Sequence, residues 1–526
     1  MADIIVYNSN ILTQDKLLPL AQAFAVAGGK FIAVGNNEPV LALQQPHTKL
    51  VDAANRTVLP GFTDAHIHIW KVGNLKTFLL DVRGVTSIAA LQDKLSDFIK
   101  NNPGNGWIQA RGFNEANMQE KRLPVKEDLD AVSEDRPVWL IRTCAHIGIA
   151  NSKAIALSGI DATTHIPAGG EMRTGNDGKP NGIFTETALG LIANKIPPYT
   201  ADDYAVMIRA AEKEMLQYGI TAATDPAVMS DLLECYHTMH NHGQLKIRIN
   251  ALPVRVPDGS ETSLPIPARF LSDQLQVHTV KFFADGGLSG MTAAMTQPYQ
   301  NSTSYGVLRL TPDFFYPLAK EAAGKGFGIA THAIGDKAID VVLEVYAQIR
   351  TAYPEILLRI EHLGLPSGAQ LALMKKLNVH CVSQSIFLKE LGKNFALYLE
   401  AERLNRIYPY RRVLDAGITL ALSSDAPVVK DFNPVTGIRA ALCRKDAEGN
   451  TIGPREAITQ NEALYAYTMG GAIANGTSDF NGSISVGKVA DFIVLNRLIR
   501  SDEDFATEND LHVSATFING VEVFSR

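Results

Sequence analysis

With 526 residues and a mass of 57.1 kDa, the chain is several times as long as an average domain, which excludes a single small module. Hydrophobic residues make up 46%, charged residues 20%, and the mean hydropathy is -0.00, a composition typical of a globular protein with a sizeable core rather than a disordered one. The net charge of -6 comes from 49 basic and 55 acidic residues without long runs of either sign, so nothing indicates a nucleic-acid partner.

No apolar run reaches the roughly 18 residues of a membrane-spanning helix, and the opening residues lack the features of a signal peptide. The cysteines are far apart and form no C-x-x-C pair, which argues against a disulfide framework and against a thiolate zinc site. We therefore expect a soluble, cytoplasmic protein with no membrane partner. The cysteines are Cys144, Cys235, Cys381 and Cys443.

The two ends of the chain share one pattern. Residues 1–60 alternate short strand-like runs with turns, and similar runs with β-branched residues around glycines return in 482–497 and 514–526. The simplest arrangement is a β-sandwich built from both termini, residues 1–60 and 476–526, beside whatever lies between them.

Between the two ends, residues 61–475 alternate short β-rich runs with longer helical patterns, which predicts parallel βα units of the α/β class. Eight runs stand out, so we expect a (β/α)8 TIM-type barrel. About 150 residues separate the first run from the second, far more than a barrel loop needs, and we expect an inserted subdomain at about 70–200. The runs are 62–68, 220–225, 246–254, 278–286, 327–335, 357–364, 379–385 and 418–425.

Histidines and a carboxylate follow several of these runs. His66 and His68 lie two residues apart on the first run, so both imidazoles face the same side about 7 Å apart. His332, His362 and Asp425 end three other runs. Each residue alone is more often structural, such as a hydrogen-bonded histidine or a turn aspartate. Together they would meet at the carboxyl end of a barrel, where imidazoles and a carboxylate suit zinc and similar divalent metals.

Lys281 lies on the fourth run, with Asp285 on the same face. A lysine that points toward metal cations must lose its proton or change its chemistry. One interpretation is a salt bridge to Asp285. The other is that the neutral amine takes up CO2 and becomes a carbamate, an anionic ligand that can bridge two metals.

These residues, in this order, resemble the amidohydrolase superfamily, and within it the YtcJ-like or N-substituted formamide deformylase-like metal-dependent hydrolases. The resemblance covers nearly the whole chain and ends with the pattern GSI-x-x-GK-x-AD. The matching segments are LPGFTDAHIH (59–68), HIGIANSKA (146–154), GGEMRTGNDGKPNGIFTE (169–186), VKFFADGG (280–287), THAIGDKAI (331–339), RIEHLG (359–364), SSDAPV (423–428), NEALYAYT (461–468) and GSISVGKVADFIVLN (482–496).

The resemblance implies one or two divalent ions, usually zinc, at the carboxyl end of the barrel. His66 and His68 would then hold the more buried metal, His332 and His362 the more exposed one, and carboxylated Lys281 would bridge them. Asp425 would complete the buried site and contact the catalytic water. Candidates for contact with the substrate are Arg142, His146, Glu186 and Asp285.

The predicted reaction is hydrolysis of a C–N bond, in an amide or formamide of a small molecule, by metal-activated water, with Asp425 taking the water's proton. One alternative is a heterocycle deaminase, which uses one metal and a glutamate near the sixth run. Glu361 precedes His362, and an ideal strand would place them on opposite faces, which argues against that role. A non-catalytic scaffold is the other alternative, and it should lack metal ligands. A homodimer is compatible with the sequence.

Overall fold

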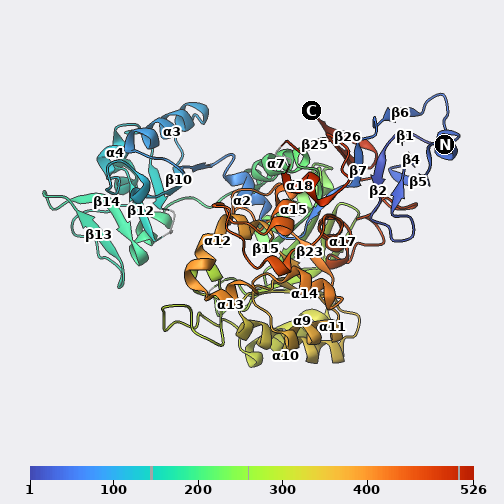
Figure 1. The fold of residues 1–526 in the computed structure, drawn as a ribbon. Coiled ribbons are helices and arrows are strands. Elements are labelled where there is room, and N and C mark those ends of the chain that lie inside the picture. Colours follow the sequence, from blue (N-terminus) through green and yellow to red (C-terminus); the bar gives the residue numbers. More distant parts are fainter. Residues whose placement is uncertain (143–145, 259, 508–509) are drawn as a thin grey trace. The chain divides into compact units, whose positions relative to one another are not determined.

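The computed structural model describes residues 1–142, 146–258, 260–507 and 510–526, so Cys144 lies outside the described residues (Figure 1). The chain divides into two compact units. The first contains Met1–Ile69 and Glu212–Arg526, and the second contains Trp70–Ala211. None of the described helices combines the length and the apolar character needed to cross a lipid bilayer.

Both ends of the chain contribute strands to one six-stranded sheet of the first unit, in the order β26-β25-β24-β7-β2-β3. Its central pair joins the two ends, because β7 runs antiparallel to β24 and Leu59 is paired with Ile493. A second sheet, in the order β5-β4-β1-β6, comes from the first 52 residues. The strands are β1 Ile4–Tyr7, β2 Asn10–Leu12, β3 Leu20–Ala21, β4 Ala23–Ala27, β5 Lys30–Gly35, β6 Lys49–Asp52, β7 Thr57–Pro60, β24 Phe492–Leu495, β25 Val513–Ile518 and β26 Val521–Ser525.

The two terminal sheets share a single hydrophobic core with an aromatic centre. The ring of Phe492 stacks on Phe517 at a centroid distance of 4.3 Å and meets the edge of Phe24 at 4.8 Å. Each of these rings is almost fully buried, which contributes about 1.5–3 kcal/mol per side chain. The alternation of apolar and polar residues around glycines at both ends therefore reflects one shared core.

The rest of the first unit is built on parallel strands in two sheets, β18-β16-β15-β8, with β17 added antiparallel at the edge, and β19-β20-β21-β22-β23. Each of the eight expected runs contains one of these strands, and nearly every residue in them is buried, as is typical of parallel sheets. The strands are β8 Phe62–Asp64, β15 Ile220–Val228, β16 Arg248–Pro253, β17 Phe270–Leu271, β18 Leu275–Val277, β19 Thr279–Phe283, β20 Gly328–Ala333, β21 Leu358–His362, β22 Val379–Ser383 and β23 Leu420–Leu422.

Backbone contacts also connect the two parallel sheets to each other. On one side, the segment after β16 forms a parallel bridge to β19 between Val254 and Lys281. On the other side, the segment after β23 follows the end of β8, because Asp425 donates from its backbone N–H to the carbonyl of His66 at 2.7 Å. These contacts place the carboxyl end of β16 beside β19, and the carboxyl end of β23 beside that of β8.

Helices follow most of the parallel strands. In α10, buried residues recur at Ala338, Val342, Val345 and Ile349, the spacing of one helix face. The hydroxyl of Tyr346 on that face donates to β20 and β21, which fixes the helix against the sheet. The helices of this unit are α1 Asn37–Leu41, α8 Ser230–Asn241, η3 Leu288–Gly290, α9 Pro312–Gly324, α10 Asp336–Ala352, α11 Gly368–Lys376, α12 Ile386–Tyr398, α13 Ala401–Leu404, α14 Tyr410–Asp415, α15 Pro434–Cys443, η4 Pro454–Glu456, α16 Gln460–Ala466, α17 Met469–Ala474 and α18 Asp502–Thr507.

The second unit has its own sheet, in the order β13-β14-β12-β11-β10-β9, and its own hydrophobic core, which includes Leu91, Leu95 and Leu140. Helices α2 and α7 contain its two boundaries. The elements are α2 Ile69–Asn74, β9 Leu79–Asp81, α3 Ile88–Asn101, β10 Ile108–Phe113, η1 Glu115–Asn117, α4 Lys126–Asp130, β11 Val138–Arg142, β12 Ile147–Ala150, α5 Ser152–Leu157, β13 Glu171–Thr174, β14 Pro180–Thr185, η2 Glu186–Leu189, α6 Gly190–Ala193 and α7 Ala201–Gln217.

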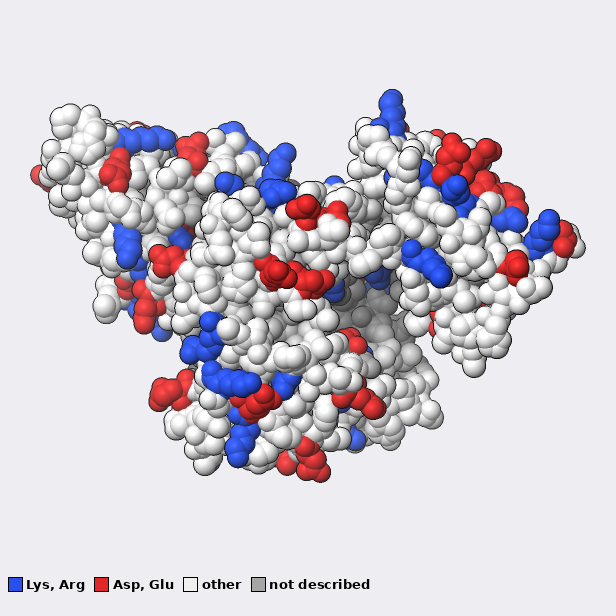
Figure 2. All heavy atoms as spheres, turned by 180° about the vertical axis from the view of Figure 1, so that it is seen from behind, with Lys and Arg blue, Asp and Glu red and all other residues white. Residues whose placement is uncertain are grey.

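Charges of both signs are mixed on the face drawn in Figure 2, where Lys and Arg lie among Asp and Glu. That face offers no continuous basic surface of the kind that binds a phosphate backbone. The absence of a nucleic-acid partner stays a prediction.

Candidate metal centre

Three predicted metal ligands from different strands form a compact group. One ligand atom each of His66, His362 and Asp425 lies within 4.8 Å of the others, and all three residues are buried. His68 joins them, because its Nε2 is 3.3 Å from Asp425 Oδ1, while His66 Nε2 is 3.4 Å from the same oxygen. That oxygen is buried and has no hydrogen-bond partner among the described residues. A buried carboxylate oxygen that faces two imidazole nitrogens fits a divalent cation.

The backbone at two of these ligands adopts a conformation that L-residues rarely take. His362 has φ 73° and Asp425 has φ 57°, both in the left-handed region. Such residues cost of order 1–3 kcal/mol each and are concentrated at functional sites. Hydrogen bonds hold both in place: Asp425 donates to the carbonyl of His66, and the hydroxyl of Ser383 donates to the carbonyl of His362 at 2.8 Å.

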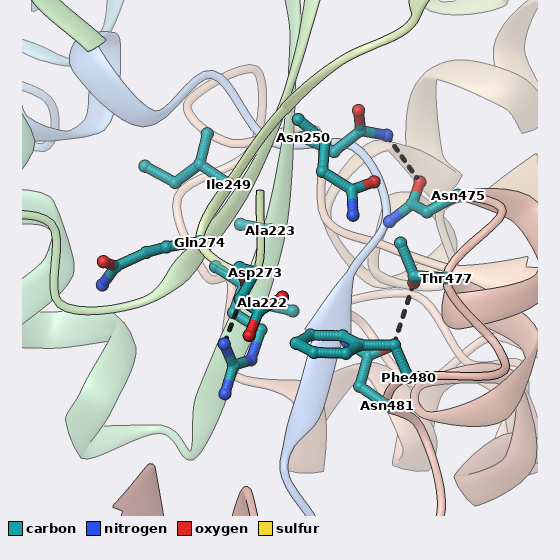
Figure 3. Close-up of a pocket in the computed structure, with 12 residues that line it drawn as sticks. Ala222, Ala223, Ile249, Asn250, Asp273, Gln274, Asn475, Thr477, Phe480 and Asn481 are labelled. Atoms are coloured by element: carbon teal, nitrogen blue, oxygen red, sulfur yellow. Dashed lines mark hydrogen bonds between the residues drawn. The ribbon is translucent and has the colours of Figure 1, made fainter. Parts of the chain in front are cut away.

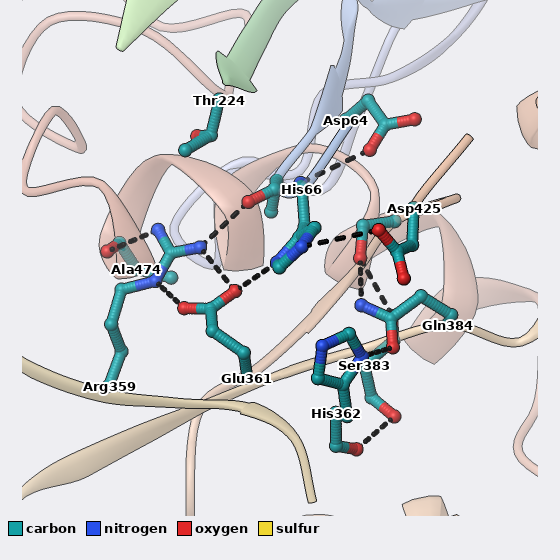
Figure 4. A network of polar contacts seen from close by, with 12 residues as sticks. Asp64, His66, Thr224, Arg359, Glu361, His362, Ser383, Gln384, Asp425 and Ala474 are labelled. Atoms are coloured by element: carbon teal, nitrogen blue, oxygen red, sulfur yellow. Dashed lines mark hydrogen bonds and ion pairs between the residues drawn. The ribbon is translucent and has the colours of Figure 1, made fainter. Parts of the chain in front are cut away.

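A carboxylate that contacts Nδ1 fixes the orientation of the His66 ring. Glu361 Oε2 lies 2.5 Å from His66 Nδ1, and both oxygens of Glu361 accept hydrogen bonds from the guanidinium of Arg359 (Figure 4). Burial acts to raise the pKa of Glu361, but Arg359 and His66 outweigh it and hold that pKa well below its ordinary value. An ionised Glu361 keeps the proton of His66 on Nδ1, so Nε2 remains available for a cation.

His362 is oriented in the same way by a neutral group. Gln384 Oε1 lies 2.7 Å from His362 Nδ1, and the Gln384 amide donates in turn to the hydroxyl of Ser423 at 3.0 Å. Burial, with the neighbouring His332 as a second cause, holds the pKa of His362 well below its ordinary value. A neutral imidazole with its Nδ1 proton fixed presents Nε2 as a metal ligand.

His332 lies beside this group, with its ring centroid 4.4 Å from that of His362. Its Nε2 is 3.1 Å from the carbonyl oxygen of Gly286 and 3.3 Å from Asp285 Oδ1. The resemblance pairs His362 with His332 at a second metal, whereas the compact group contains His362 together with His66 and Asp425. The structure therefore brings four of the six predicted ligands, His66, His68, His362 and Asp425, close together, with His332 beside His362.

The carboxylate of Asp285 connects two backbone segments next to this group. Its fully buried carboxylate accepts hydrogen bonds from the backbone N–H groups of Ala294, Ile334 and Gly335, at 2.8–3.0 Å. These bonds tie the segment after β19 to the end of β20. The salt bridge between Lys281 and Asp285, which the sequence left open, does not form among the described residues. Contact of Asp285 with the substrate stays a prediction.

Lys281 is buried, and its Nζ has no hydrogen-bond partner among the described residues. The nitrogen lies 5.0 Å from the centroid of the Phe283 ring. Burial lowers the pKa of Lys281 to about 8, although the nearby carboxylates of Glu361 and Asp425 favour the charged form. An amine in this environment is much more readily neutral than an exposed lysine.

Three further candidates lie in the second unit. Arg142 forms a two-pronged ion pair with Glu115, at 2.7 and 3.0 Å. His146 Nδ1 lies 2.9 Å from Glu186 Oε2, and Glu186 has φ 49°. Thus His146 and Glu186 are brought together at the ends of β12 and β14, while contact of Arg142, His146 and Glu186 with a substrate stays a prediction.

The expectation that Glu361 faces away from the site is wrong. Arg359 and Glu361 share one face of β21, as an ideal strand requires. The left-handed φ of His362 ends this alternation, so that the side chains of both Glu361 and His362 lie next to His66. Sequence reasoning therefore missed both Arg359 and Glu361. Their signal was a basic and an acidic residue, two positions apart, inside an otherwise apolar strand.

Asp64 was also missed, although it begins the D-x-H-x-H pattern. Its Oδ1 accepts from the backbone N–H groups of His66 and Ser424, at 3.2 and 3.1 Å, and so connects the segments after β8 and β23. Burial raises the pKa of Asp64 to about 7. The residue shapes the backbone that presents His66.

A small cavity lies at the opposite, amino-terminal ends of β15 and β16, next to the segment after α17 (Figure 3). Its volume of about 20 Å³ is space for roughly one water molecule, so it cannot hold a substrate. Arg248 at its wall forms two hydrogen bonds to Asp491, at 2.6 and 2.9 Å. This end of the strands joins the parallel sheets to the C-terminal segment.

Comparisons with known proteins agree with this geometry. N-substituted formamide deformylase of Arthrobacter pascens is 30% identical, over 100% of this chain and 99% of that protein. The YtcJ protein of Bacillus subtilis (strain 168) is 27% identical over 91% of each chain. The crystal structure of an uncharacterized metal-dependent hydrolase from Pyrococcus horikoshii OT3 superposes with a TM-score of 0.77 and 25% identity, over 95% of this chain and 99% of that one. Because the Amidohydro_3 family model also matches residues 49–524, the chain belongs to the amidohydrolase family and is a hydrolase.

Proposed function

We propose that the protein is a metal-dependent hydrolase that cleaves the C–N bond of an amide or formamide in a small molecule. The observation that carries the proposal is the buried Oδ1 of Asp425, which has no hydrogen-bond partner among the described residues and faces the Nε2 atoms of His66 and His68. A divalent cation held there would lower the pKa of water toward about 7, so that hydroxide would be available at neutral pH. The formamide deformylase relative supports the choice of bond.

His66, His68, His362 and Asp425 would hold this ion, and zinc is the metal that best suits three imidazoles and one carboxylate. Lys281 and His332 would serve a second ion. We also propose that Lys281 carries a carbamate: the ammonium group first loses one proton, the neutral nitrogen then bonds to the carbon of CO2, and a second proton leaves to solvent. This converts a buried cation that has no hydrogen-bond partner among the described residues into an anion.

Asp425 would move the proton. Its carboxylate accepts a proton from the attacking water and then donates it to the leaving nitrogen, so that amide and water become acid and amine. The left-handed backbone and the bond to the His66 carbonyl fix the position of this carboxylate. His66 and His362 keep their Nδ1 protons, which face Glu361 and Gln384, and do not take part in the transfer.

The fold that supports this chemistry is a closed (β/α)8 barrel. The Val254–Lys281 bridge and the Asp425–His66 hydrogen bond support closure of the two parallel sheets. We further propose that the shared aromatic core of the terminal sheets makes them a β-sandwich, and that residues 70–200 are an insertion after the first barrel strand.

Two measurements test the proposed function. Metal analysis of the purified protein should find a divalent ion that a chelator removes and added zinc replaces. A screen of N-formyl, N-acetyl and heterocyclic compounds should then release formate or acetate from an amide. Release of ammonia from a heterocycle alone would favour a deaminase, and a protein that neither contains nor accepts a divalent ion would refute both reactions.

A further inference from the structure

We infer that Glu361 and Arg359 form a positioning pair that fixes the orientation of His66 as a metal ligand, and that Glu361 transfers no proton in the reaction. The inference rests on the proposed function, because it assigns His66 to the metal. It concerns how the chain holds that ligand.

The position of Glu361 is fixed on both of its oxygens. Arg359 Nε donates to Oε1 at 2.5 Å, Arg359 Nη2 donates to Oε2 at 3.0 Å, and Oε2 also accepts from His66. Neither side chain has exposed surface. A group that shuttles protons must reach the substrate or a water beside it, and Glu361 has no free oxygen with which to do so.

Arg359 is anchored in turn to the backbone next to the metal ligand and to the end of a distant helix. Its Nη2 donates to the carbonyl of Ala65 at 2.7 Å, one residue before His66, and its Nη1 donates to Asn475 Oδ1 at 2.7 Å. Thr224 on β15 and Asn250 on β16 donate to the same Asn475 oxygen, at 2.9 and 3.2 Å. Two parallel strands, through Asn475, and the segment after β8 therefore fix the guanidinium that binds Glu361.

His66 and His362 differ in the charge of the group that lies within hydrogen-bond distance of Nδ1. His66 has a carboxylate at Nδ1, and His362 has the neutral amide of Gln384. A carboxylate accepts a stronger hydrogen bond and raises the basicity of the imidazole more than an amide does. The structure thus assigns His66 the role of the stronger of the two nitrogen ligands, by means of Glu361.

The test compares Glu361→Gln, which places an amide behind His66 as Gln384 does behind His362, with the double variant Arg359→Gln/Glu361→Gln. The single variant leaves Arg359 as an unpaired buried charge, whereas the double variant removes both charges. Zinc affinity is measured by competition with a chelator, and stability by denaturant unfolding of the metal-free protein. We expect both variants to bind zinc about 10–100-fold more weakly than the wild type, and the double variant to regain stability relative to Glu361→Gln.

Glu456→Gln is the matched control. Glu456 is also buried and accepts from the guanidinium of Arg412 at 2.5 Å, but it contacts none of the proposed ligands. This variant should lose stability and keep wild-type zinc affinity. Glu361→Asp retains the charge but withdraws the carboxylate from His66, so the visible spectrum of its cobalt-loaded form should differ from that of the wild type.

Wild-type zinc affinity in the double variant, or an unchanged cobalt spectrum in Glu361→Asp, would overturn the inference. A wild-type protein that binds zinc, shows these differences and hydrolyses no amide would refute the proposed reaction and leave the positioning pair intact. A wild type that binds no zinc would overturn both.

Discussion

Replacement of Lys281 by Met should make the metal-free protein more stable at pH 7 while it abolishes activity. The amine is buried without a hydrogen-bond partner among the described residues, and its pKa is lowered from 10.5 to about 8. At 1.36 kcal/mol for each pKa unit, the protonated lysine costs the folded state about 3 kcal/mol. Methionine has a similar volume and carries no charge, so the cost disappears with the substitution.

The sign of the pH dependence follows from the same shift. Because the pKa of Lys281 is lower in the folded state than in the unfolded state, the cost is complete below about pH 8, declines as the pH rises toward 10.5 and is absent above that value. The advantage of Lys281→Met should therefore be largest at pH 7 and small at pH 10.5. In the metal-loaded enzyme, conversion of the Lys281 amine to a carbamate would also remove the cost of burying the ammonium group.

Denaturant unfolding of the wild type and of Lys281→Met measures the difference in their free energies of unfolding. Both proteins are treated with a chelator and kept in buffer freed of CO2, and each is unfolded at pH 7 and at pH 10. The comparison requires that the free energy of both proteins falls with the same slope against denaturant. A variant that is no more stable than the wild type at pH 7 would refute the reasoning, as would an advantage that does not shrink at high pH.

Three other substitutions or treatments have defined outcomes. Lys281→Ala should lose activity that bicarbonate with a short-chain carboxylic acid partly restores, and full activity without these additions would contradict the carbamate. Asp425→Asn should lower kcat by about 100-fold or more in steady-state assays of amide hydrolysis, because the proton transfer is lost; a kcat within a few fold of the wild type would argue against that role. Arg248→Met should destabilise the protein by about 3–5 kcal/mol in denaturant unfolding, since it leaves the buried carboxylate of Asp491 unpaired, and a change below 1 kcal/mol would show that water compensates that charge.

The positions of the strands and of the proposed metal ligands could be predicted because both depend on simple periodicity. Buried parallel strands leave short apolar runs, and residues that follow such runs meet at one edge. That reasoning predicted that the strand-end histidines and Asp425 meet at one end of the strands. The structure groups His66, His362 and Asp425, with His68 next to Asp425 and His332 next to His362.

The contacts behind the ligands could not be predicted in this way. The face that Glu361 occupies depends on one left-handed residue, His362, and no spacing rule signals that φ in advance. Gln384 was not among the predicted site residues, and its hydrogen bond to His362 depends on side-chain torsions. Asp285 follows the end of β19, and three backbone N–H groups occupy its carboxylate.

The pairing of β7 with β24 has a consequence for how the chain is made. During synthesis on the ribosome, β7 pairs early with β2 on one side, but its other edge has no partner until residues 492–495 emerge. An unpaired edge strand can recruit other chains. The nascent protein therefore carries that open edge until residues 492–495 have been made, and pairing with this segment ends the exposure of the edge to aggregation.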